Sequence, residues 1–360
     1  MKKILGFGLM ALLTTCHFSC EESATNKLKK SNKSSGKSTK NFSLTSPSGY
    51  PQKPQGSIIP IALKNKTGVQ VDSIHYYINN SLLHSATNLN PYQWDTKSNR
   101  LGKSFIRVET WAEGKKEVKN KSVLILSDKP QELIPYTLLN SYPHDKKAYT
   151  QGLEFHDGLL YESTGTYGES DIRKVALTSG EVLKIKALDK ERFGEGLTVI
   201  DDKIIQLTWR SREGYVYDKN TFDVLKTFQY QKSDEGWGLC YDGKQLLKSD
   251  GSEKIYFLDP ETFHETSHIE VYNHQGPIKN LNELEYVDGY LYANVYGADQ
   301  IIKINPSTGK LLQVIDLRGI LEEEDKHPTI DVLNGIAYNH DKKTWYITGK
   351  HWPKLFEISF

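Results

Sequence analysis

Hydrophobic and polar residues alternate along most of this chain in a pattern that favours strands. From residue 50 onward, β-branched and aromatic residues occur in short runs, and turn residues such as Asn79-Asn80 and Gly114-Lys115 separate them. No helical period is needed anywhere in 135–360. Four early runs are expected to be strands: Ser57–Leu63, Val69–Tyr77, Phe105–Trp111 and Glu117–Ser127. The pattern predicts an all-β protein that begins with a small immunoglobulin-like β-sandwich over 50–130.

Residues from Tyr149 onward form a fivefold repeat. Each repeat opens with a short motif that leads into strand-like runs separated by turns. The central positions of these openings lie 42–52 residues apart, at Gly152, Gly196, Gly238, Glu283 and Gly335. Four strands in roughly 40–45 residues are typical of one propeller blade, so the sequence predicts a five-bladed β-propeller over 135–360. The last repeat stops after its third strand, and the run Glu132–Tyr142 is expected to supply the missing outer strand.

The N-terminus has the pattern of a secretion signal. Two lysines precede an apolar run, Ile4–Leu13, that is too short to span a bilayer and fits a signal peptide over 1–20. A bacterial lipoprotein signal ends at a cysteine that takes the lipid. Ser19 favours Cys20 as that cysteine, with Cys16 as the alternative. An ordinary cleaved signal without lipid also stays open.

Residues 21–49 consist largely of Ser, Thr, Lys, Asn and Gly, which predicts a disordered tether. We therefore expect an exported protein that is lipid-anchored to the bacterial cell envelope, at the periplasm or the outer membrane surface. Cys240 is then the only internal cysteine, and we expect it to be a buried small hydrophobic residue.

Composition excludes several classes of protein. The net charge is +1, so no overall field is available to recruit nucleic acid. The mean hydropathy of -0.56 excludes a protein with many membrane spans. Three cysteines are too few for a disulfide-built scaffold or a four-cysteine zinc site, and the 11 histidines are scattered. Aromatic residues make up 11% of the chain, which suits half-buried strands and binding faces.

The repeat predicts a site at one mouth of the channel. Equivalent positions in five blades lie on a circle, so the residues just before the central positions face the same mouth: Gln151, Glu195, Trp237, Asn282 and Asn334. The second strands return there at Thr164, Trp209, Asp250, Tyr296 and Lys350. Glu195 is an acid among amides and aromatics, between two glycines. Burial is expected to raise its pKa and to suit it for acid–base catalysis.

Structural roles stay open for several of these residues. Gln151 or Asn334 can cap backbone groups at the tunnel mouth. Trp209 and Trp237 can fill the core between blades, and Lys350 can be solvated.

Seven motifs occur in one order and make the chain recognisable. They are Tyr-Thr-Gln-Gly-Leu, Phe-Gly-Glu-Gly-Leu, Leu-Thr-Trp, Gly-Trp-Gly-Leu, Leu-Asn-Glu-Leu-Glu, Asp-Val-Leu-Asn-Gly-Ile-Ala and Gly-Lys-His-Trp-Pro-Lys-Leu-Phe-Glu-Ile. Over about 135–360 the chain resembles the plant and bacterial type of glutaminyl-peptide cyclotransferase. That family is a five-bladed propeller, in agreement with the repeat count.

The resemblance implies an activity and the residues that carry it. Enzymes of this family convert an N-terminal glutaminyl residue to pyroglutamate and release ammonia, without a metal or cofactor. By motif, Glu195 resembles the acid/base carboxylate. The substrate-binding residues are expected to be Gln151, Phe193, Trp209, Trp237, Asn282, Glu283, Tyr296, Asn334 and Lys350. Many members of the family have tryptophan where this chain has Tyr296. The tyrosine is expected to keep an aromatic wall there and to add a hydroxyl group.

We expect peptides or proteins with N-terminal Gln as substrates, a membrane contact through the lipid anchor, no nucleic-acid partner and a monomer. One alternative is a non-catalytic, surface-tethered propeller that binds peptides or glycans. Another is a metal-dependent, lactonase-like hydrolase, which needs several axial carboxylates. Its candidate ligands are Glu195, Glu283 and Asp250.

Overall fold

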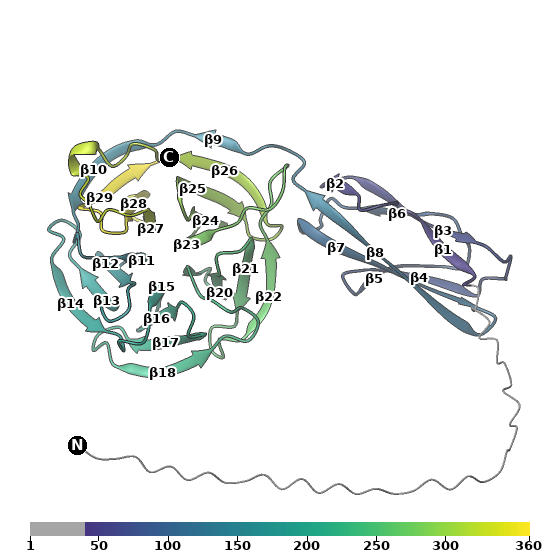
Figure 1. Cartoon of the computed structure of the whole chain (residues 1–360), viewed down its shortest axis with the longest axis horizontal. Coiled ribbons are helices and arrows are strands. Elements are labelled where there is room, and N and C mark those ends of the chain that lie inside the picture. The colour runs from purple at the N-terminus through teal and green to yellow at the C-terminus, as the bar shows by residue number, and fades with distance from the viewer. Residues whose placement is uncertain (1–39) are drawn as a thin grey trace, which may run out of the picture. The chain divides into compact units, whose positions relative to one another are not determined.

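Figure 1 shows the computed structural model, which describes residues 40–360. Within this range every regular element is a β-strand except one short 3₁₀ helix, η1 (Glu323–Asp325), which confirms the all-β prediction. The predicted signal peptide over 1–20, with Cys16 and Cys20, lies outside the described residues, as do residues 21–39 of the predicted tether. Across 40–360 no helix is long and apolar enough to cross a membrane.

Residues 42–126 form two sheets that share one core. The smaller sheet has the order β1 (Phe42–Ser46), β3 (Ile58–Asn65) and β6 (Tyr92–Asp95). The larger has the order β2 (Gln52–Pro54), β8 (Lys115–Leu126), β7 (Gly102–Ala112), β4 (Ser73–Ile78) and β5 (Ser81–Ala86). Every second residue of β4 is buried, and β3 follows the same alternation as far as Leu63. Ile61 of the smaller sheet packs in one cluster with Ile74 and Ile106 of the larger.

The prediction of a disordered tether over 21–49 is wrong at its C-terminal end. There β1 pairs antiparallel with β3, and Phe42 is only 1% exposed. The Asn41 backbone N–H donates to Glu117 Oε1 at 2.7 Å, which ties this segment to β8 as well. Phe42 and Leu44 are apolar residues in an otherwise polar stretch, and the buried Phe42 and the partly buried Leu44 stabilise the strand.

Residues 132–359 form five further sheets, built mainly from strands that are consecutive in the chain. The first three are β11 (Thr150–His156), β12 (Leu159–Thr164), β13 (Asp171–Val175) and β14 (Val182–Ala187); β15 (Gly194–Ile200), β16 (Lys203–Thr208), β17 (Glu213–Asp218) and β18 (Val224–Gln229); and β19 (Leu239–Tyr241), β20 (Leu246–Ser249), β21 (Lys254–Leu258) and β22 (Glu265–Glu270). The last two contain β23 (Leu281–Val287), β24 (Tyr290–Val295), β25 (Ala298–Asn305) and β26 (Lys310–Asp316), and β27 (Leu333–Asn339), β28 (Thr344–Gly349) and β29 (Lys354–Ser359).

The run predicted over Glu132–Tyr142 divides between two of these sheets. Its second half, β10 (Thr137–Pro143), pairs antiparallel with β29 and completes the last sheet, as expected. Its first half, β9 (Glu132–Ile134), pairs parallel with β26 and adds a fifth strand to the preceding sheet. This segment therefore links the beginning of the repeat region to its end.

In Figure 1 the five sheets surround a common centre, with β11, β15, β23 and β27 near it and β14, β18, β22 and β26 outside. The innermost strands contact one another in turn: β11 with β15, β15 with β19, β19 with β23, β23 with β27, and β27 with β11. The repeated glycine permits this approach. A Cβ on Gly196 would lie 2.6 Å from Leu239 N, and one on Gly238 would lie 2.1 Å from Asn282 O. Side chains at these positions would force the strands apart.

Apolar residues fill the space between neighbouring sheets. Leu247 and Ile255 of the third sheet, for example, pack with Leu284 and Ile302 of the fourth. Cys240 lies in the same cluster and is a free, buried thiol, which confirms its predicted role. This packing holds the innermost strands, and the residues at their ends, in fixed positions.

Candidate active site

A cavity of about 240 Å³ opens at one end of the innermost strands. Its lining residues come from the beginning of a first strand or from just beyond the end of a second strand. They are Tyr149, Gln151, Phe193, Glu195, Trp209, Trp237, Asn282, Tyr296 and Lys350. The repeat therefore predicted seven of these side chains at one mouth, and the family resemblance added Phe193.

Glu195 lies on β15 at the cavity wall and is 4% exposed. Its Oε1 accepts a hydrogen bond from Gln151 Nε2 at 3.2 Å. Burial raises the pKa of Glu195 well above its ordinary value. The positive charge of Lys350 opposes this rise in pKa, and the negative charge of Glu235 adds to it. Glu195 is thus a carboxyl group whose affinity for a proton is high for its residue type.

Aromatic rings surround this carboxyl group. Tyr149 and Phe193 meet edge to face at 6.2 Å between centroids, and Phe193 is 5.5 Å from Trp209. Trp237 meets Tyr296 edge to face at 5.8 Å. Three rings thus form one wall and two rings form another, and the carboxylate of Glu235 spans the gap between Trp209 and Trp237.

Glycines beneath two of these rings keep the walls in place. A Cβ on Gly165 would lie 2.3 Å from Phe193 Cε1, and one on Gly251 would lie 2.7 Å from Trp237 Cζ2. The two glycines occupy equivalent positions in the first and third sheets, just after the second strand. A side chain at either position would push the ring above it into the cavity.

Lys350 closes the other gap in the aromatic wall. Its Nζ lies 4.5 Å from the Tyr149 ring centroid and 5.3 Å from that of Tyr296. Burial lowers the pKa of Lys350, and the charges of Glu195 and Asp331 oppose that decrease. The alternative of a solvated Lys350 is excluded, since this side chain is buried in the wall.

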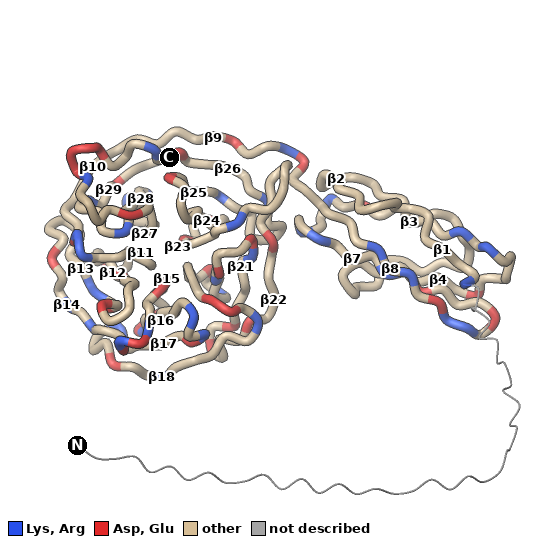
Figure 2. Tube along the Cα trace, viewed as in Figure 1, with Lys and Arg blue, Asp and Glu red and all other residues tan. Residues whose placement is uncertain are grey.

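Polar groups of the wall have capacity left for a ligand. Asn282 is buried, and its Oδ1 accepts no hydrogen bond from any residue in 40–360. Charges of both signs are interspersed around the ring (Figure 2), so local groups set the electrostatics of the cavity. Nowhere in 40–360 do three His, Cys, Asp or Glu side chains gather as a metal site requires.

Two predicted substrate-binding residues lie outside the cavity lining. Glu283 is fully buried and accepts hydrogen bonds from the backbone N–H groups of Leu153 at 3.2 Å and Ile336 at 2.9 Å. It therefore joins β23 to β11 and β27. Asn334 Nδ2 donates to Thr150 O at 3.0 Å, so it caps a backbone carbonyl behind Gln151. Both predictions of substrate contact are corrected to structural roles.

Asp250 is also outside the cavity, although the repeat placed it at the same mouth. Its Oδ1 accepts a hydrogen bond from the Ser252 backbone N–H at 3.0 Å, and it lines a separate depression next to Trp237. Thr164 is buried and its Oγ1 accepts a hydrogen bond from the Asp171 backbone N–H at 3.0 Å. These two residues support turns at the rim.

Sequence reasoning missed Tyr149 and its partner Asp331. The Tyr149 hydroxyl donates to Asp331 Oδ2 at 2.9 Å, and burial, together with this contact, raises the pKa of the phenol. Tyr149 opens its motif at the position that Phe193 occupies in the next repeat, so the repeat alone was sufficient to find it. Asp331 lies before β27 and carried no comparable signal.

Three comparisons relate this chain to known proteins. A family model described as glutamine cyclotransferase matches residues 108–360. The chain is 40% identical over 260 residues to glutaminyl-peptide cyclotransferase of Arabidopsis thaliana, covering 71% of this chain and 78% of the relative. It also matches the crystal structure of Myxococcus xanthus glutaminyl cyclase with a TM-score of 0.58 and 32% identity, over 63% of this chain and 97% of the other.

Proposed function

We propose how this chain, which belongs to the glutamine cyclotransferase family, uses its cavity as a glutaminyl-peptide cyclotransferase. The resemblance seen in the motifs is confirmed, and so is the activity it implies. The non-catalytic binding module is therefore set aside. The observation that carries the proposed mechanism is a single buried carboxyl group, Glu195, inside a small aromatic cavity.

The substrate is an N-terminal glutaminyl residue, which must fold back on itself to react. Its α-amine nitrogen attacks the carbon of its own side-chain amide, a carbon–nitrogen bond forms, and a five-membered ring closes. A cavity of about 240 Å³ with aromatic walls favours this folded conformer over extended ones. Binding energy from the walls thus offsets the conformational entropy that the glutaminyl side chain loses when it folds for cyclisation.

Attack places negative charge on the amide oxygen. Gln151, Asn282 and Lys350 line the cavity and supply the donors that stabilise this oxyanion. The Lys350 ammonium also disfavours a second positive charge nearby, so it favours the neutral, nucleophilic form of the substrate amine.

Glu195 moves the proton. Its carboxylate accepts a proton from the attacking amine, and the resulting carboxylic acid donates it to the departing nitrogen. The carbon–nitrogen bond of the side-chain amide then breaks, and ammonia and the pyroglutamyl peptide leave. The high proton affinity that burial gives Glu195 suits both transfers near neutral pH.

A peptide with a blocked amine tests this function. The enzyme is incubated, with and without EDTA, with a glutaminyl peptide and with the same peptide N-acetylated. Ammonia release from the free-amine peptide alone, unchanged by EDTA, is the expected result. Release from both peptides would show simple amide hydrolysis, and release from neither by folded enzyme would refute the assignment.

The fold proposal is that the five sheets of 132–359 form a five-bladed β-propeller and that the two N-terminal sheets form an immunoglobulin-like sandwich. The order of contacts among the innermost strands supports the first part. The shared core of the two sheets supports the second.

The proposed location is the bacterial cell envelope, with a lipid on Cys20 and with Cys16 as the alternative. The signal-like composition of residues 1–20 supports it. Metabolic labelling with a fatty acid tests it: Cys20→Ser is expected to abolish labelling, and Cys16→Ser to leave it. The reverse pattern would move the anchor to Cys16, and labelling of neither wild type nor variants would refute the anchor.

A further inference from the structure

Glu235 lies just outside the cavity and joins two of its walls. Its Oε2 accepts a hydrogen bond from Trp209 Nε1 at 2.7 Å and another from Trp237 Nε1 at 2.9 Å. Trp209 follows β16 and Trp237 precedes β19, so the two rings belong to different sheets. Glu235 Oε1 accepts from Arg210 Nε at 3.1 Å, and the Arg210 guanidinium lies 3.9 Å from the Trp209 ring centroid. One carboxylate thus sets the spacing between two aromatic walls.

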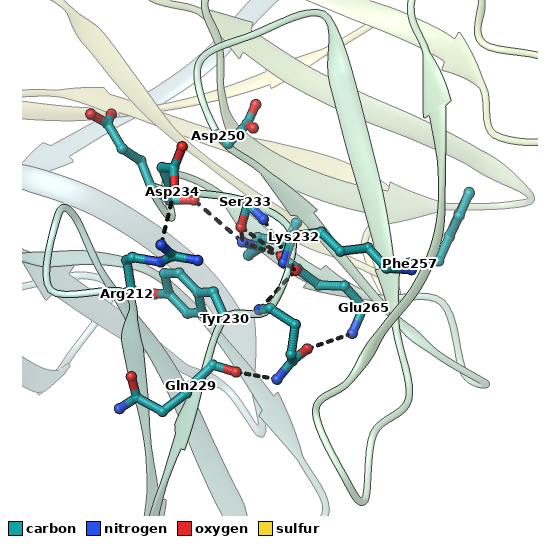
Figure 3. A network of polar contacts seen from close by, with 12 residues as sticks. Arg212, Gln229, Tyr230, Lys232, Ser233, Asp234, Asp250, Phe257 and Glu265 are labelled. Atoms are coloured by element: carbon teal, nitrogen blue, oxygen red, sulfur yellow. Dashed lines mark hydrogen bonds and ion pairs between the residues drawn. The ribbon is translucent and has the colours of Figure 1, made fainter. Parts of the chain in front are cut away.

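A second carboxylate holds the segment that carries Glu235. Figure 3 shows Glu265 of β22 beside Lys232 and Ser233. Glu265 Oε2 accepts hydrogen bonds from three consecutive backbone N–H groups, those of Gln231 at 3.1 Å, Lys232, and Ser233 at 3.2 Å. Its Oε1 accepts from Ser233 Oγ at 2.6 Å. The loop between β18 and β19 is therefore held at successive residues up to two positions before Glu235.

Lys248 neutralises Glu265 in the interior. Its Nζ lies 2.8 Å from Glu265 Oε1, and both side chains are 0% exposed. Nζ also donates to Ser233 Oγ and, at 3.3 Å, to the backbone carbonyl oxygen of Glu235 itself. The Tyr230 ring centroid is 4.0 Å away. The buried pair thus contacts the backbone at both ends of the segment.

The arrangement places a negative charge near the catalytic carboxyl group. Hydrogen bonds from Trp237, Trp209 and Arg210 outweigh burial and lower the pKa of Glu235, so it is an anion at neutral pH. The charged and titratable groups that act on or are affected by Glu195 are Lys350, Glu235, Tyr149 and Tyr230. Of these groups, Glu235 is the carboxylate, and its negative charge raises the pKa of Glu195, so neutralising it is expected to lower that pKa.

We propose that Glu235 is a positioning residue of this active site. Its carboxylate fixes Trp209 against Trp237, and the buried Lys248–Glu265 pair fixes Glu235. This inference rests on the proposed function of the cavity and of Glu195. It assigns a role in the reaction to a network that otherwise looks like ordinary internal packing.

The first test compares Glu235→Gln and Glu235→Ala with Asp234→Asn. Asp234 is the neighbouring residue, its side chain is 88% exposed, and it pairs with Arg212 at 3.2 Å rather than with the rings. Loss of a charged hydrogen bond to the walls is expected to raise KM for a glutaminyl peptide about tenfold in Glu235→Gln, and more in Glu235→Ala. The acid limb of kcat/KM is expected to move to lower pH in both variants. Asp234→Asn is expected to match wild type in both readouts.

The second test asks whether Glu235 acts through the indole N–H groups. Trp209→Phe keeps an aromatic wall but removes the donor. If Glu235 acts through this bond, the KM increase of Glu235→Gln combined with Trp209→Phe is expected to be smaller than the product of the single increases. A combined effect equal to that product would overturn the proposal.

Glu195→Gln is measured alongside the Glu235 variants, so that a failure of the positioning role can be distinguished from a failure of the proposed function. Loss of turnover in Glu195→Gln, together with wild-type KM and an unshifted acid limb in both Glu235 variants, would overturn the positioning role alone. Full turnover in Glu195→Gln would overturn the proposed function, and KM in the Glu235 variants would still decide whether Glu235 positions the walls.

Discussion

Lys248→Met is expected to destabilise the protein strongly, because it leaves Glu265 buried without its positive partner. The Lys248 ammonium lies 2.8 Å from Glu265 Oε1, and neither side chain is exposed. Breaking a buried ion pair by removing one partner costs about 3–5 kcal/mol. For a unit of this size, each kcal/mol corresponds to roughly 2–4 °C in Tm. We therefore expect a fall in Tm of about 6–20 °C.

The assay is urea unfolding followed by tryptophan fluorescence, with Tm measured in parallel by circular dichroism. Lys326→Met is the matched control, because Lys326 pairs with Glu323 at an exposed site, where the same substitution is expected to change nothing measurable. Adding Glu265→Gln to Lys248→Met removes both charges, so the double variant is expected to lose less than the sum of the single losses. A loss in Lys248→Met no larger than in the control would refute the reasoning.

Three further predictions follow from single contacts. Gly238→Ala is expected to lower both Tm and kcat/KM, because its Cβ would lie 2.1 Å from a carbonyl oxygen of the next innermost strand. The control Gly276→Ala, whose Cβ meets nothing within 4 Å, is expected to leave both unchanged, and equal Tm values for the two variants would contradict the prediction. Tyr149→Phe keeps the ring but loses the 2.9 Å hydrogen bond to Asp331, so kcat/KM is expected to fall less than tenfold, while a hundredfold fall would show a direct chemical role for the hydroxyl. The ion pair and hydrogen bonds of Glu265 outweigh burial and hold its pKa at about 2, below its ordinary 4.5, so its contribution to the unfolding free energy is full above pH about 4.5 and is lost as pH falls toward 2. Unfolding free energies measured across this pH range are expected to depend less on pH in the Lys248→Met variant than in wild type. An equal pH dependence would contradict the pairing.

The repeat was the strongest signal in the sequence, and its physical basis explains its success. Four of the five repeats have a glycine at the centre, which permits close approach of the innermost strands, as the contacts of Gly196 and Gly238 show. Residues just before the central position then occupy equivalent positions at one mouth. For this reason the sequence pattern was sufficient to place Gln151, Glu195, Trp237 and Asn282 at the cavity.

The same equivalence misplaced residues where the five repeats differ. Asn334 lies behind Gln151 and binds backbone instead of lining the cavity. Asp331 and Glu235 act through contacts with residues of other sheets or loops, and no local pattern encodes such contacts. Among the N-terminal strands, β5 was missed because nearly every residue along it is exposed, which removes the alternation that marks a half-buried strand.

The catalytic carboxyl group is the centre of this account, and Glu195→Gln tests it most directly. Ammonia release from a glutaminyl peptide is measured for wild type and variant, while quenching of tryptophan fluorescence reports peptide binding in both. The account predicts retained binding and a fall in kcat of at least about a hundredfold, since a positioned acid–base group contributes about 10²–10⁴-fold. Turnover within a few-fold of wild type would contradict it.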